Sequence, residues 1–296
     1  MKWRGRRSSS NVNRRGSAGG GFGGGSRRSG GGFPMMPVGG GGGLILMIIL
    51  FLVFGGNLFG GGGDPAPTNN NAQQEQGYDA TAEERELEDF LSVVLADTED
   101  YWNQIFSERG MNYTEPTLHI YQDTVRSGCG VAQSNMGPFY CPADEGIYID
   151  VSFYHDLKNE YGAEGDFALA YVLAHEVGHH VQKQMGILDE VYSLQSQLPE
   201  AEFNQYMVRM ELQADYLAGV FAHYTQENGY LEQGDFEEAM NAAAGVGDDR
   251  IQEKAWGQVV PDKFTHGTSE QRMRWFNRGF EYGDLENGDT FGVDQL

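Results

Sequence analysis

Residues 166–186, "DFALAYVLAHEVGHHVQKQMG", place three histidines and a glutamate inside an otherwise apolar run of a very acidic chain. The apolar residues recur at the spacing of a buried α-helix. Within this run, His175, Glu176 and His179 form the pattern H-E-x-x-H. Two interpretations are open: a metal site with a catalytic base, or ordinary polar residues on a helix.

The spacing of the two histidines favours a metal site. Residues four apart on a helix share one face, with Cβ atoms about 5–6 Å apart, so two imidazoles can reach one Zn²⁺ at about 2.0–2.1 Å. Glu176 lies roughly 100° round the helix from His175, where it can take a proton from water. The pattern therefore predicts His175 and His179 as metal ligands and Glu176 as the base. His180 points away from His179, and we expect it to be a helix neighbour.

A third metal ligand is required, and two known sequence patterns could supply it. The pattern H-x-x-G-x-x-H is excluded, because Gln182 and Met185 occupy the positions of its glycine and last histidine. Residues 209–219, "RMELQADYLAG", supply Glu211 and Asp215 within an apolar stripe. Buried carboxylates need partners. We predict that Glu211 is the third ligand and that Asp215 accepts the free ring N–H of a ligand histidine; a solvated acidic face is the alternative.

The charge of the chain is divided unevenly along it. The 296 residues include 20 Lys and Arg against 43 Asp and Glu, a net charge of −23, and all of the acids follow residue 63. So acidic a domain is poorly suited to nucleic acid or to anionic lipid. We expect no nucleic-acid partner, although a nucleic-acid-associated protein acting through the Arg/Gly tail is a less favoured alternative.

The first 80 residues divide into three predicted segments. Residues 1–43, rich in Gly, Arg and Ser, predict a disordered basic cytoplasmic tail. Residues 44–60, which begin "LILMIILFLVF", predict one transmembrane anchor; a cleaved signal peptide is the alternative. Residues 61–80 predict a flexible linker. The basic residues before the anchor predict a cytoplasmic N-terminus on a single-pass membrane protein, with the domain periplasmic or extracellular.

The two cysteines lie close together in the chain. Cys129 and Cys141 fall between two predicted strands, in a stretch that contains Gly and Pro. Outside the cytoplasm we expect them to form a disulfide, whereas in the cytosol two free thiols would be expected.

A folded domain is predicted over residues 81–285, with residues 286–296 as a C-terminal tail. "TAEE" predicts a capping box at Thr81 and Glu84 before the first helix. Alternating patterns predict strands at 117–121 and 147–153. Helical patterns follow at 166–185, 188–197, 200–227, 232–246 and 269–282. The sequence thus predicts an α+β fold that is mainly helical, with a small β-sheet.

Four stretches together resemble a known family. They are "GCG…GPFYCP" (128–142), "LAHEVGHHVQ" (173–182), "ELQADYLAG" (211–219) and "FTHGTSEQR" (264–272). H-E-x-x-H followed by E-x-x-x-D resembles the gluzincin zinc peptidases, and the four stretches resemble the bacterial predicted neutral zinc metallopeptidases. The likeness covers roughly residues 81–285. It implies a zincin-like metallopeptidase domain that uses Zn²⁺ on a peptide or protein substrate, usually behind one membrane span.

The stretch "FTHGTSEQR" adds two candidate catalytic residues by analogy. It is similar to the T-H-P-x-x-x-x-R segment of membrane-linked gluzincins, with Gly267 in place of the proline. The analogy implies that His266 or Arg272 stabilises the oxyanion of the tetrahedral intermediate. A loop histidine and a helix-surface arginine are the alternative. Thr268 and Gln271 predict a second capping box, and strand 147–153 is a candidate edge for a peptide substrate by fold analogy.

Taken together, the sequence predicts a zinc-dependent peptidase in which Glu176 is the general base. The alternative is a non-catalytic, zinc-stabilised binding or assembly module at the cell surface. An open fourth position on the metal would favour the peptidase, and a closed shell of four protein ligands would favour the module.

Overall fold

The computed structural model describes residues 1–14 and 80–296, which form an α+β fold that is mainly helical with two small sheets. This confirms the predicted fold class at that level. The helices are α2 (Ala82–Glu108), α3 (Phe153–Asn159), α4 (Asp166–Gln184), α5 (Ile187–Ser193), α6 (Glu200–Glu227), α7 (Asp235–Gly245), α8 (Asp248–Trp256) and α9 (Ser269–Tyr282). The strands are β1 (Val12–Arg14), β2 (Thr117–Tyr121), β3 (Thr124–Ser127), β4 (Gly130–Gln133), β5 (Phe139–Cys141) and β6 (Gly146–Asp150).

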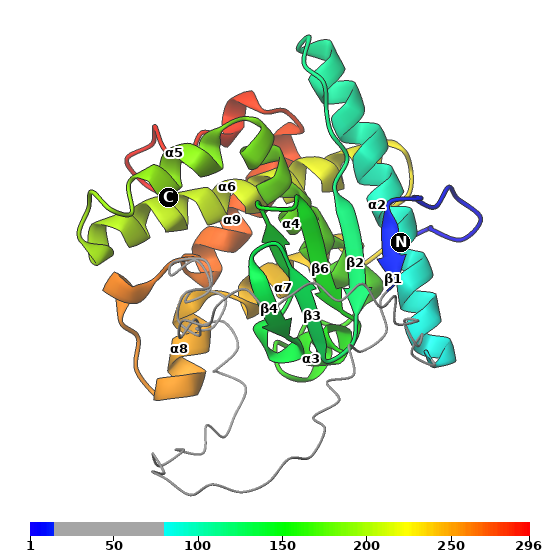
Figure 1. Cartoon of the computed structure of the whole chain (residues 1–296), viewed down its shortest axis with the longest axis horizontal. Coiled ribbons are helices and arrows are strands. Elements are labelled where there is room, and N and C mark those ends of the chain that lie inside the picture. The colour runs from blue at the N-terminus through cyan, green and yellow to red at the C-terminus, as the bar shows by residue number, and fades with distance from the viewer. Residues whose placement is uncertain (15–79) are drawn as a thin grey trace, which may run out of the picture.

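The larger sheet has the strand order β1-β2-β6-β5 (Figure 1). β1, β2 and β6 are parallel, and β5 runs antiparallel to β6 at the other edge. Alternate side chains divide between the two faces of the sheet. Leu118 and Ile149 join the helical core, whereas Tyr121 and Tyr148 join a separate cluster with the β3–β4 hairpin. The sheet therefore has helices on one face and the hairpin on the other.

Helix α4 passes through the middle of the molecule and packs on α2, α6 and α7. Two helix crossings depend on glycine, which lets backbones approach closely. A Cβ added to Gly219 of α6 would lie 2.0 Å from the carbonyl oxygen of Phe276 in α9. A Cβ added to Gly178 of α4 would lie 3.1 Å from the carbonyl oxygen of Ala214 in α6. The second contact matters most, because it sets the distance between the two helices that carry the predicted ligands.

Both predicted capping boxes are present, at Thr81 with Glu84 and at Thr268 with Gln271. Other boundaries differ from the prediction. The predicted strand 147–153 ends at Asp150, whose carboxylate accepts the amide of Ser152 as the chain turns into α3. Helix α8 was not predicted, because its first turn overlaps the Gly- and Asp-rich run that had been interpreted as a break.

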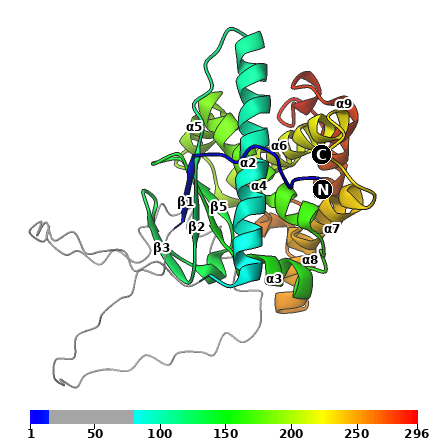
Figure 2. The same cartoon turned by 90° about the vertical axis from the view of Figure 1, so that its right-hand side faces the viewer.

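The N-terminal residues differ from the predicted disordered tail. Residues 1–14 lie against the domain and cross α2 (Figure 2), and β1 pairs in parallel with β2. The amino group of Met1 lies 2.7 Å from the Asp166 carboxylate at the start of α4. The rest of the predicted tail, the predicted anchor 44–60 and the linker up to residue 79 lie outside the described residues. Within residues 1–14 and 80–296, no helix is both long and apolar enough for a membrane span.

Residues 286–296 also differ from the separate tail that was predicted. The segment begins with a short 3₁₀ helix (Glu286–Gly288) and returns to α6. The Thr290 hydroxyl donates to the carbonyl oxygen of Arg209 at 2.6 Å, and Arg209 donates to the carbonyl of Val293 at 3.0 Å. Thr290 is fully buried. The end of the chain therefore belongs to the folded domain.

Candidate metal centre

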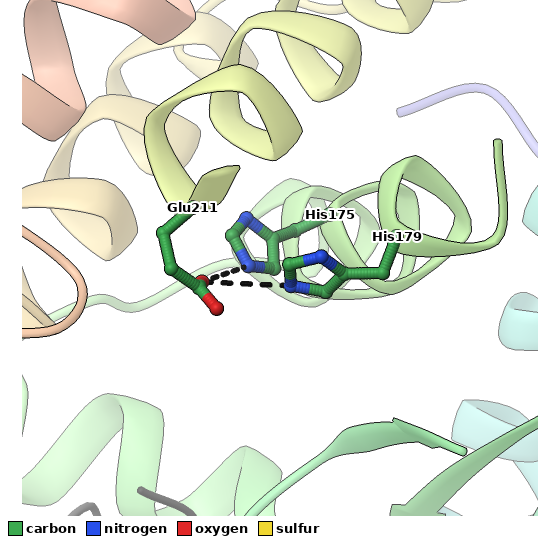
Figure 3. Close-up of side chains that lie close together, drawn as sticks. All are labelled: His175, His179 and Glu211. Atoms are coloured by element: carbon green, nitrogen blue, oxygen red, sulfur yellow. Dashed lines mark hydrogen bonds and ion pairs between the residues drawn. The ribbon is translucent and has the colours of Figure 1, made fainter. Parts of the chain in front are cut away.

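Three predicted ligands meet between α4 and α6. His175 and His179 project from α4 toward Glu211 on α6 (Figure 3). The Glu211 Oε2 atom lies 3.2 Å from His175 Nε2 and 3.5 Å from His179 Nε2. One donor atom of each residue lies within 4.8 Å of the others, and all three residues are buried. The structure thus brings together the two histidines and the carboxylate that the sequence had paired.

The start of α4 is fixed by a carboxylate from another helix. Gly165 precedes the helix with φ at 122° and has no side chain to cap it. Instead, Glu238 of α7 accepts the amide of Phe167 at 3.0 Å, which satisfies one of the free N–H groups of the first turn. A Cβ at Gly165 would lie 1.9 Å from the Glu238 carboxyl carbon. Gly165 therefore leaves room for the cap that fixes the first turn of α4.

The outer ring nitrogens of both histidines are held by hydrogen bonds. His175 Nδ1 lies 2.9 Å from Asp215 Oδ1, and His179 Nδ1 lies 2.9 Å from the Gln182 side-chain oxygen. Because both partners are acceptors, each Nδ1 carries the proton and each Nε2 is left to face Glu211. Asp215 thus lies beside the ring N–H of His175, one of the two histidines with which the sequence analysis had paired it. Gln182 was missed as a partner, although its position three residues after His179 puts it on the same helix face.

Asp215 is itself held by two further side chains. Arg272 donates to it through Nε at 2.8 Å and Nη2 at 3.0 Å, and the Tyr171 hydroxyl donates at 2.6 Å. Burial alone would raise the pKa of Asp215, but Arg272 and His175 lower it to about 2. The carboxylate is therefore charged at neutral pH and stabilises the proton on His175 Nδ1.

This network changes the interpretation of Arg272. The prediction offered His266 or Arg272 as the oxyanion group. Arg272 is 4% exposed and its third nitrogen, Nη1, donates to the carbonyl of Val246 at 3.1 Å. Since its guanidinium is already committed to Asp215 and Val246, the geometry favours a positioning role for Arg272.

His266 faces the same carboxylate as the two helical histidines. Its Nε2 lies 3.9 Å from Glu211 Oε2, and its Nδ1 lies 3.5 Å from Asp248 Oδ1. The other Asp248 oxygen accepts the backbone amides of Thr265 at 2.8 Å and Gly267 at 3.0 Å. Burial lowers the pKa of His266, but Glu211 and Asp248 raise it above its ordinary value overall. Asp248 was missed because it lies in the run interpreted as a helix break.

Glu176 lies beside the three ligands and lines the pocket in front of them. Burial raises its pKa, and the charges of His175 and His179 oppose that rise only in part. His180, in contrast, contacts the Tyr140 hydroxyl at 3.0 Å and the carbonyl of Thr114 at 2.6 Å. It is therefore a structural neighbour, as predicted.

The ligands open onto a pocket. Its charged and titratable lining includes Glu176, His266, Arg272 and the three ligand side chains. Its walls are largely apolar and include Phe139, Tyr140, Phe153, Val172, Leu188 and Tyr192. An apolar pocket with a few converging polar groups is the usual form of a small-molecule or peptide site.

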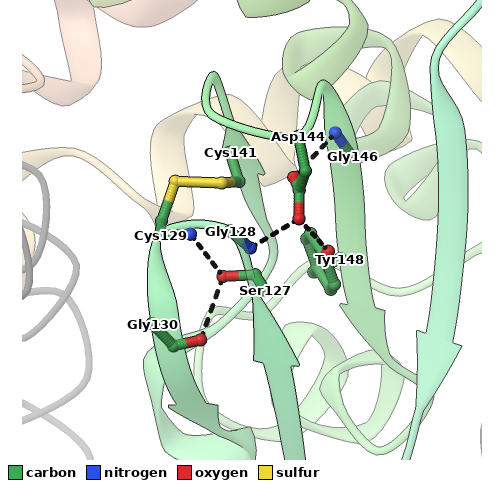
Figure 4. The surroundings of a disulfide bond; sticks show 8 residues. All are labelled: Ser127, Gly128, Cys129, Gly130, Cys141, Asp144, Gly146 and Tyr148. Carbon is green, nitrogen blue, oxygen red and sulfur yellow. Dashed lines mark hydrogen bonds between the residues drawn. A yellow bond between two sulfur atoms is a disulfide. The ribbon is translucent and has the colours of Figure 1, made fainter. Parts of the chain in front are cut away.

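One wall of the pocket is the edge strand β5, which a disulfide joins to the β3–β4 hairpin (Figure 4). Cys129 lies between β3 and β4, and Cys141 is the last residue of β5, so the predicted disulfide is confirmed. The expectation for strand 147–153 was wrong, because β6 lies between β2 and β5 and is no edge. The Asp144 carboxylate closes the same corner by accepting the Gly128 amide and the Tyr148 hydroxyl.

Comparison with known proteins agrees with this geometry. The profile of the family described as "Putative neutral zinc metallopeptidase" matches residues 1–291. The chain belongs to this family. It is 55% identical over 220 residues to "Uncharacterized protein YpfJ" of Escherichia coli K12. The matched residues make up 74% of this chain and 77% of the relative. It is 42% identical over 195 residues to "Uncharacterized protein Rv2575" of Mycobacterium tuberculosis, covering 62% and 65%. No solved structure matches the chain.

The donor set fits the zinc ion that the family's description implies. Zinc in catalytic sites is held by three protein ligands, often two histidines and a glutamate, with one position left open. Here two imidazole nitrogens and one carboxylate oxygen converge, and both imidazoles are held in the tautomer that a metal needs. The fourth side of the set faces the pocket.

Proposed function

We propose that the protein is a zinc-dependent peptidase in which His175, His179 and Glu211 hold the metal. The observation that carries the proposal is the position of this ligand set. It opens, together with Glu176, onto a pocket with apolar walls. A structural zinc site would instead be closed by a fourth protein ligand.

Glu176 is the general base of the proposed reaction. When bound, a zinc ion would polarise the scissile carbonyl and lower the pKa of a water molecule beside it. Glu176 takes the proton from that water and passes it to the leaving amine. Because burial raises the pKa of Glu176, its carboxyl can hold the proton between these two steps at a pH nearer to neutral.

His266 is the residue best placed to stabilise the oxyanion. Its pKa is raised, which favours the protonated, donating form of the ring, and it lines the same pocket as the α4 histidines. Removal of one such donor commonly lowers kcat about 10²–10³-fold. Arg272 contributes indirectly, by holding Asp215 and so the ring of His175.

The substrate that best fits the site is an extended peptide or protein segment. Edge strands bind extended peptides through backbone hydrogen bonds, and β5 is an edge strand that forms one wall of the pocket. We propose that the peptide lies along β5, and that the apolar walls accept an apolar side chain beside the scissile bond.

The disulfide supports a location in an oxidising compartment. Disulfides such as Cys129–Cys141 persist outside the cytoplasm and are rare within it. We therefore propose that the domain lies in the periplasm or outside the cell.

The experiment is hydrolysis of a broad peptide library by the full-length chain loaded with one equivalent of zinc. Glu176→Gln keeps the size of the side chain and removes the base, so turnover should fall about 10²–10⁴-fold while the zinc content stays the same. Glu202→Gln, an exposed residue on α6, is the matched control. If the wild type binds zinc but cleaves nothing, the site belongs to a non-catalytic binding module. If Glu176→Gln turns over at the wild-type rate, Glu176 is not the base.

A further inference from the structure

The segment that follows α9, residues 284–293, packs along one side of α6 and is here called the return segment (Figure 1). Three residues at helical spacing hold it to α6: Arg209, Gln213 and Tyr216. The Tyr216 hydroxyl donates to the Asp284 carboxylate at 3.0 Å. The Gln213 side-chain nitrogen donates to the carbonyl of Gly288 at 3.1 Å. The residues of the return segment, all of which the structure describes, do not line the pocket, so they can act on the metal centre only through other residues.

A chain of side-chain amides leads from Gly288 to the metal centre. The Gln213 side-chain oxygen accepts from the Gln182 side-chain nitrogen at 3.0 Å. The same Gln182 nitrogen donates to the carbonyl of Met210 at 2.7 Å. The Gln182 side-chain oxygen, at the other end of that amide, lies 2.9 Å from His179 Nδ1. Because Gln182 is fully buried, these protein groups replace water as its hydrogen-bond partners.

This chain of hydrogen bonds has one direction, because it begins at a backbone carbonyl. A carbonyl oxygen can only accept, so the nitrogen of the Gln213 amide faces Gly288 and its oxygen faces Gln182. That oxygen and the Met210 carbonyl take both N–H groups of Gln182, which leaves the Gln182 oxygen for His179. His179 Nδ1 then carries the proton, and its Nε2 is left for a metal.

We propose that the return segment positions the metal centre through Gln213, which makes Gln213 and Gly288 positioning residues for the ligand His179. This inference rests on the metal centre of the proposed function. When the Gly288 carbonyl is removed from its place, the Gln213 amide can turn over and present its nitrogen to the nitrogen of Gln182. The Gln182 amide then loses an acceptor, and the orientation that holds His179 loses its advantage over the flipped one.

The two ligand histidines are thus held by two different arms that both lead to the last part of the fold. His175 is held by Asp215, which Arg272 of α9 holds in turn. His179 is held through amides that end at the segment after α9. Docking of the return segment and zinc binding are therefore coupled, and each should strengthen the other by the same factor.

The first test is the zinc affinity of the full chain, measured by competition with a chelator. Gln213→Leu removes both side-chain hydrogen bonds from a residue that is not a ligand, so zinc affinity should fall about tenfold. Gln205→Leu makes the same change at an exposed position of α6 and should bind zinc as the wild type does. Denaturant unfolding of the ion-free chains shows whether each variant folds.

A second variant acts from the other end of the amide chain. In Gly288→Ala the added Cβ would lie 2.6 Å from ring carbons of Tyr216, so the backbone of the return segment must move away from α6. Zinc affinity should fall in this variant too, although α4 and α6 keep their wild-type sequence. Gly288→Ala also decides the question if Gln213→Leu does not fold.

The second test is amide hydrogen exchange of the return segment with and without zinc. In the wild type, zinc should slow exchange of the backbone amides of residues 288–293 by about the factor by which Gln213→Leu weakens zinc binding. In Gln213→Leu, zinc should leave the exchange of these amides unchanged. A side chain that only stabilised the fold would not couple these two sites.

The outcomes separate this proposal from the proposed function. If the wild type binds zinc, and a folded Gln213→Leu or Gly288→Ala binds it as tightly, the role of the return segment is wrong and the metal centre stands. If zinc does not change the exchange of residues 288–293 in the wild type, the coupling is likewise refuted. A wild type that binds no zinc would overturn both proposals.

Discussion

At the scale of single residues, each proposed ligand histidine has one ring nitrogen that faces Glu211 and one that the protein holds. His175 is held by the carboxylate of Asp215, whereas His179 is held by the neutral amide of Gln182. A carboxylate partner makes an imidazole a stronger base than an amide partner does. The Asp215 carboxylate therefore stabilises the proton that His175 must give up to make room for a metal.

The pKa of His175 predicts how zinc binding depends on pH. Burial lowers the pKa of His175, but Asp215 and Glu211 raise it from 6.5 to about 9. The ion-free chain gains stability from this proton below pH 6.5 and loses the gain as pH rises through 9. Because zinc must displace the proton, zinc affinity should rise about tenfold per pH unit in that window and level off above it.

The measurement is competition for zinc with a chelator of known affinity between pH 6 and pH 9.5, with the chelator's own protonation taken into account. Asp215→Asn should lower the pKa of His175, and the dependence of affinity on pH should become flatter. An affinity that does not change with pH in the wild type would contradict this account of His175.

The positions of the proposed ligands were predictable from the sequence, but several of their partners were not. His175 and His179 follow from one helical period, and Glu211 and Asp215 follow from two acids in an apolar stripe. Gln182 could have been found in the same way, by its position one turn after His179. Asp248 could not have been found from the sequence, because only the folded structure brings the start of α8 beside the loop that carries His266. Arg272 was predicted as a candidate, but its role depends on contacts with other elements.

At the scale of elements, the metal centre depends on the distance between α4 and α6. Gly178 lies between the two ligand histidines and faces Ala214, which lies between Glu211 and Asp215. A glycine and an alanine therefore face each other between the two helices that carry the proposed ligands.

Gly178→Ala should separate zinc affinity from stability. The added Cβ would lie 3.1 Å from the Ala214 carbonyl oxygen and 3.2 Å from its Cα, so α6 must shift by a few tenths of an ångström. Alanine is about 1 kcal/mol better than glycine within a helix, which offsets the cost of that shift to folding. We expect zinc affinity to fall about tenfold, since ligand geometry is sensitive to such shifts, while the free energy of unfolding of the ion-free chain changes by less than about 1 kcal/mol.

Calorimetric zinc titration and denaturant unfolding of the same preparation measure the two quantities. Ala174→Ser, one turn earlier on α4, is a control of similar size. If Gly178→Ala binds zinc as tightly as the wild type, the contact between α4 and α6 does not set the ligand geometry.

The disulfide should matter for substrate binding and not for the metal. Cys141 ends β5, which lines the pocket, whereas all three ligands lie on α4 and α6. A disulfide that closes a short loop contributes about 2–4 kcal/mol to stability. In the double variant Cys129→Ser and Cys141→Ser we expect lower stability and a higher KM for peptides, with one zinc per chain retained. Loss of zinc with an unchanged KM would show that the disulfide supports the ligand helices instead.

At the scale of the whole molecule, the sequence predicted the helical framework better than the termini. Helices α6 and α9 begin and end as their apolar periodicity indicated. The packing of residues 1–14 was missed because Gly, Ser and Arg carry no apolar periodicity, and their partners are carboxylates on α2, far along the chain. Residues 286–296 were missed for a related reason, since their packing depends on Arg209. Both segments are held by polar contacts, which leave little trace in a local sequence pattern.

The central claim is that α4 and α6 together hold one zinc ion through His175, His179 and Glu211. Metal analysis of the full-length chain, purified without chelators and dialysed against trace zinc, tests it most directly. The account predicts one zinc per chain for the wild type and for Glu202→Ala, whose side chain is exposed on the same helix as Glu211. It predicts that Glu211→Ala retains less than about a tenth of that zinc, because only two ligands remain. Equal zinc in Glu211→Ala and the wild type would contradict the claim.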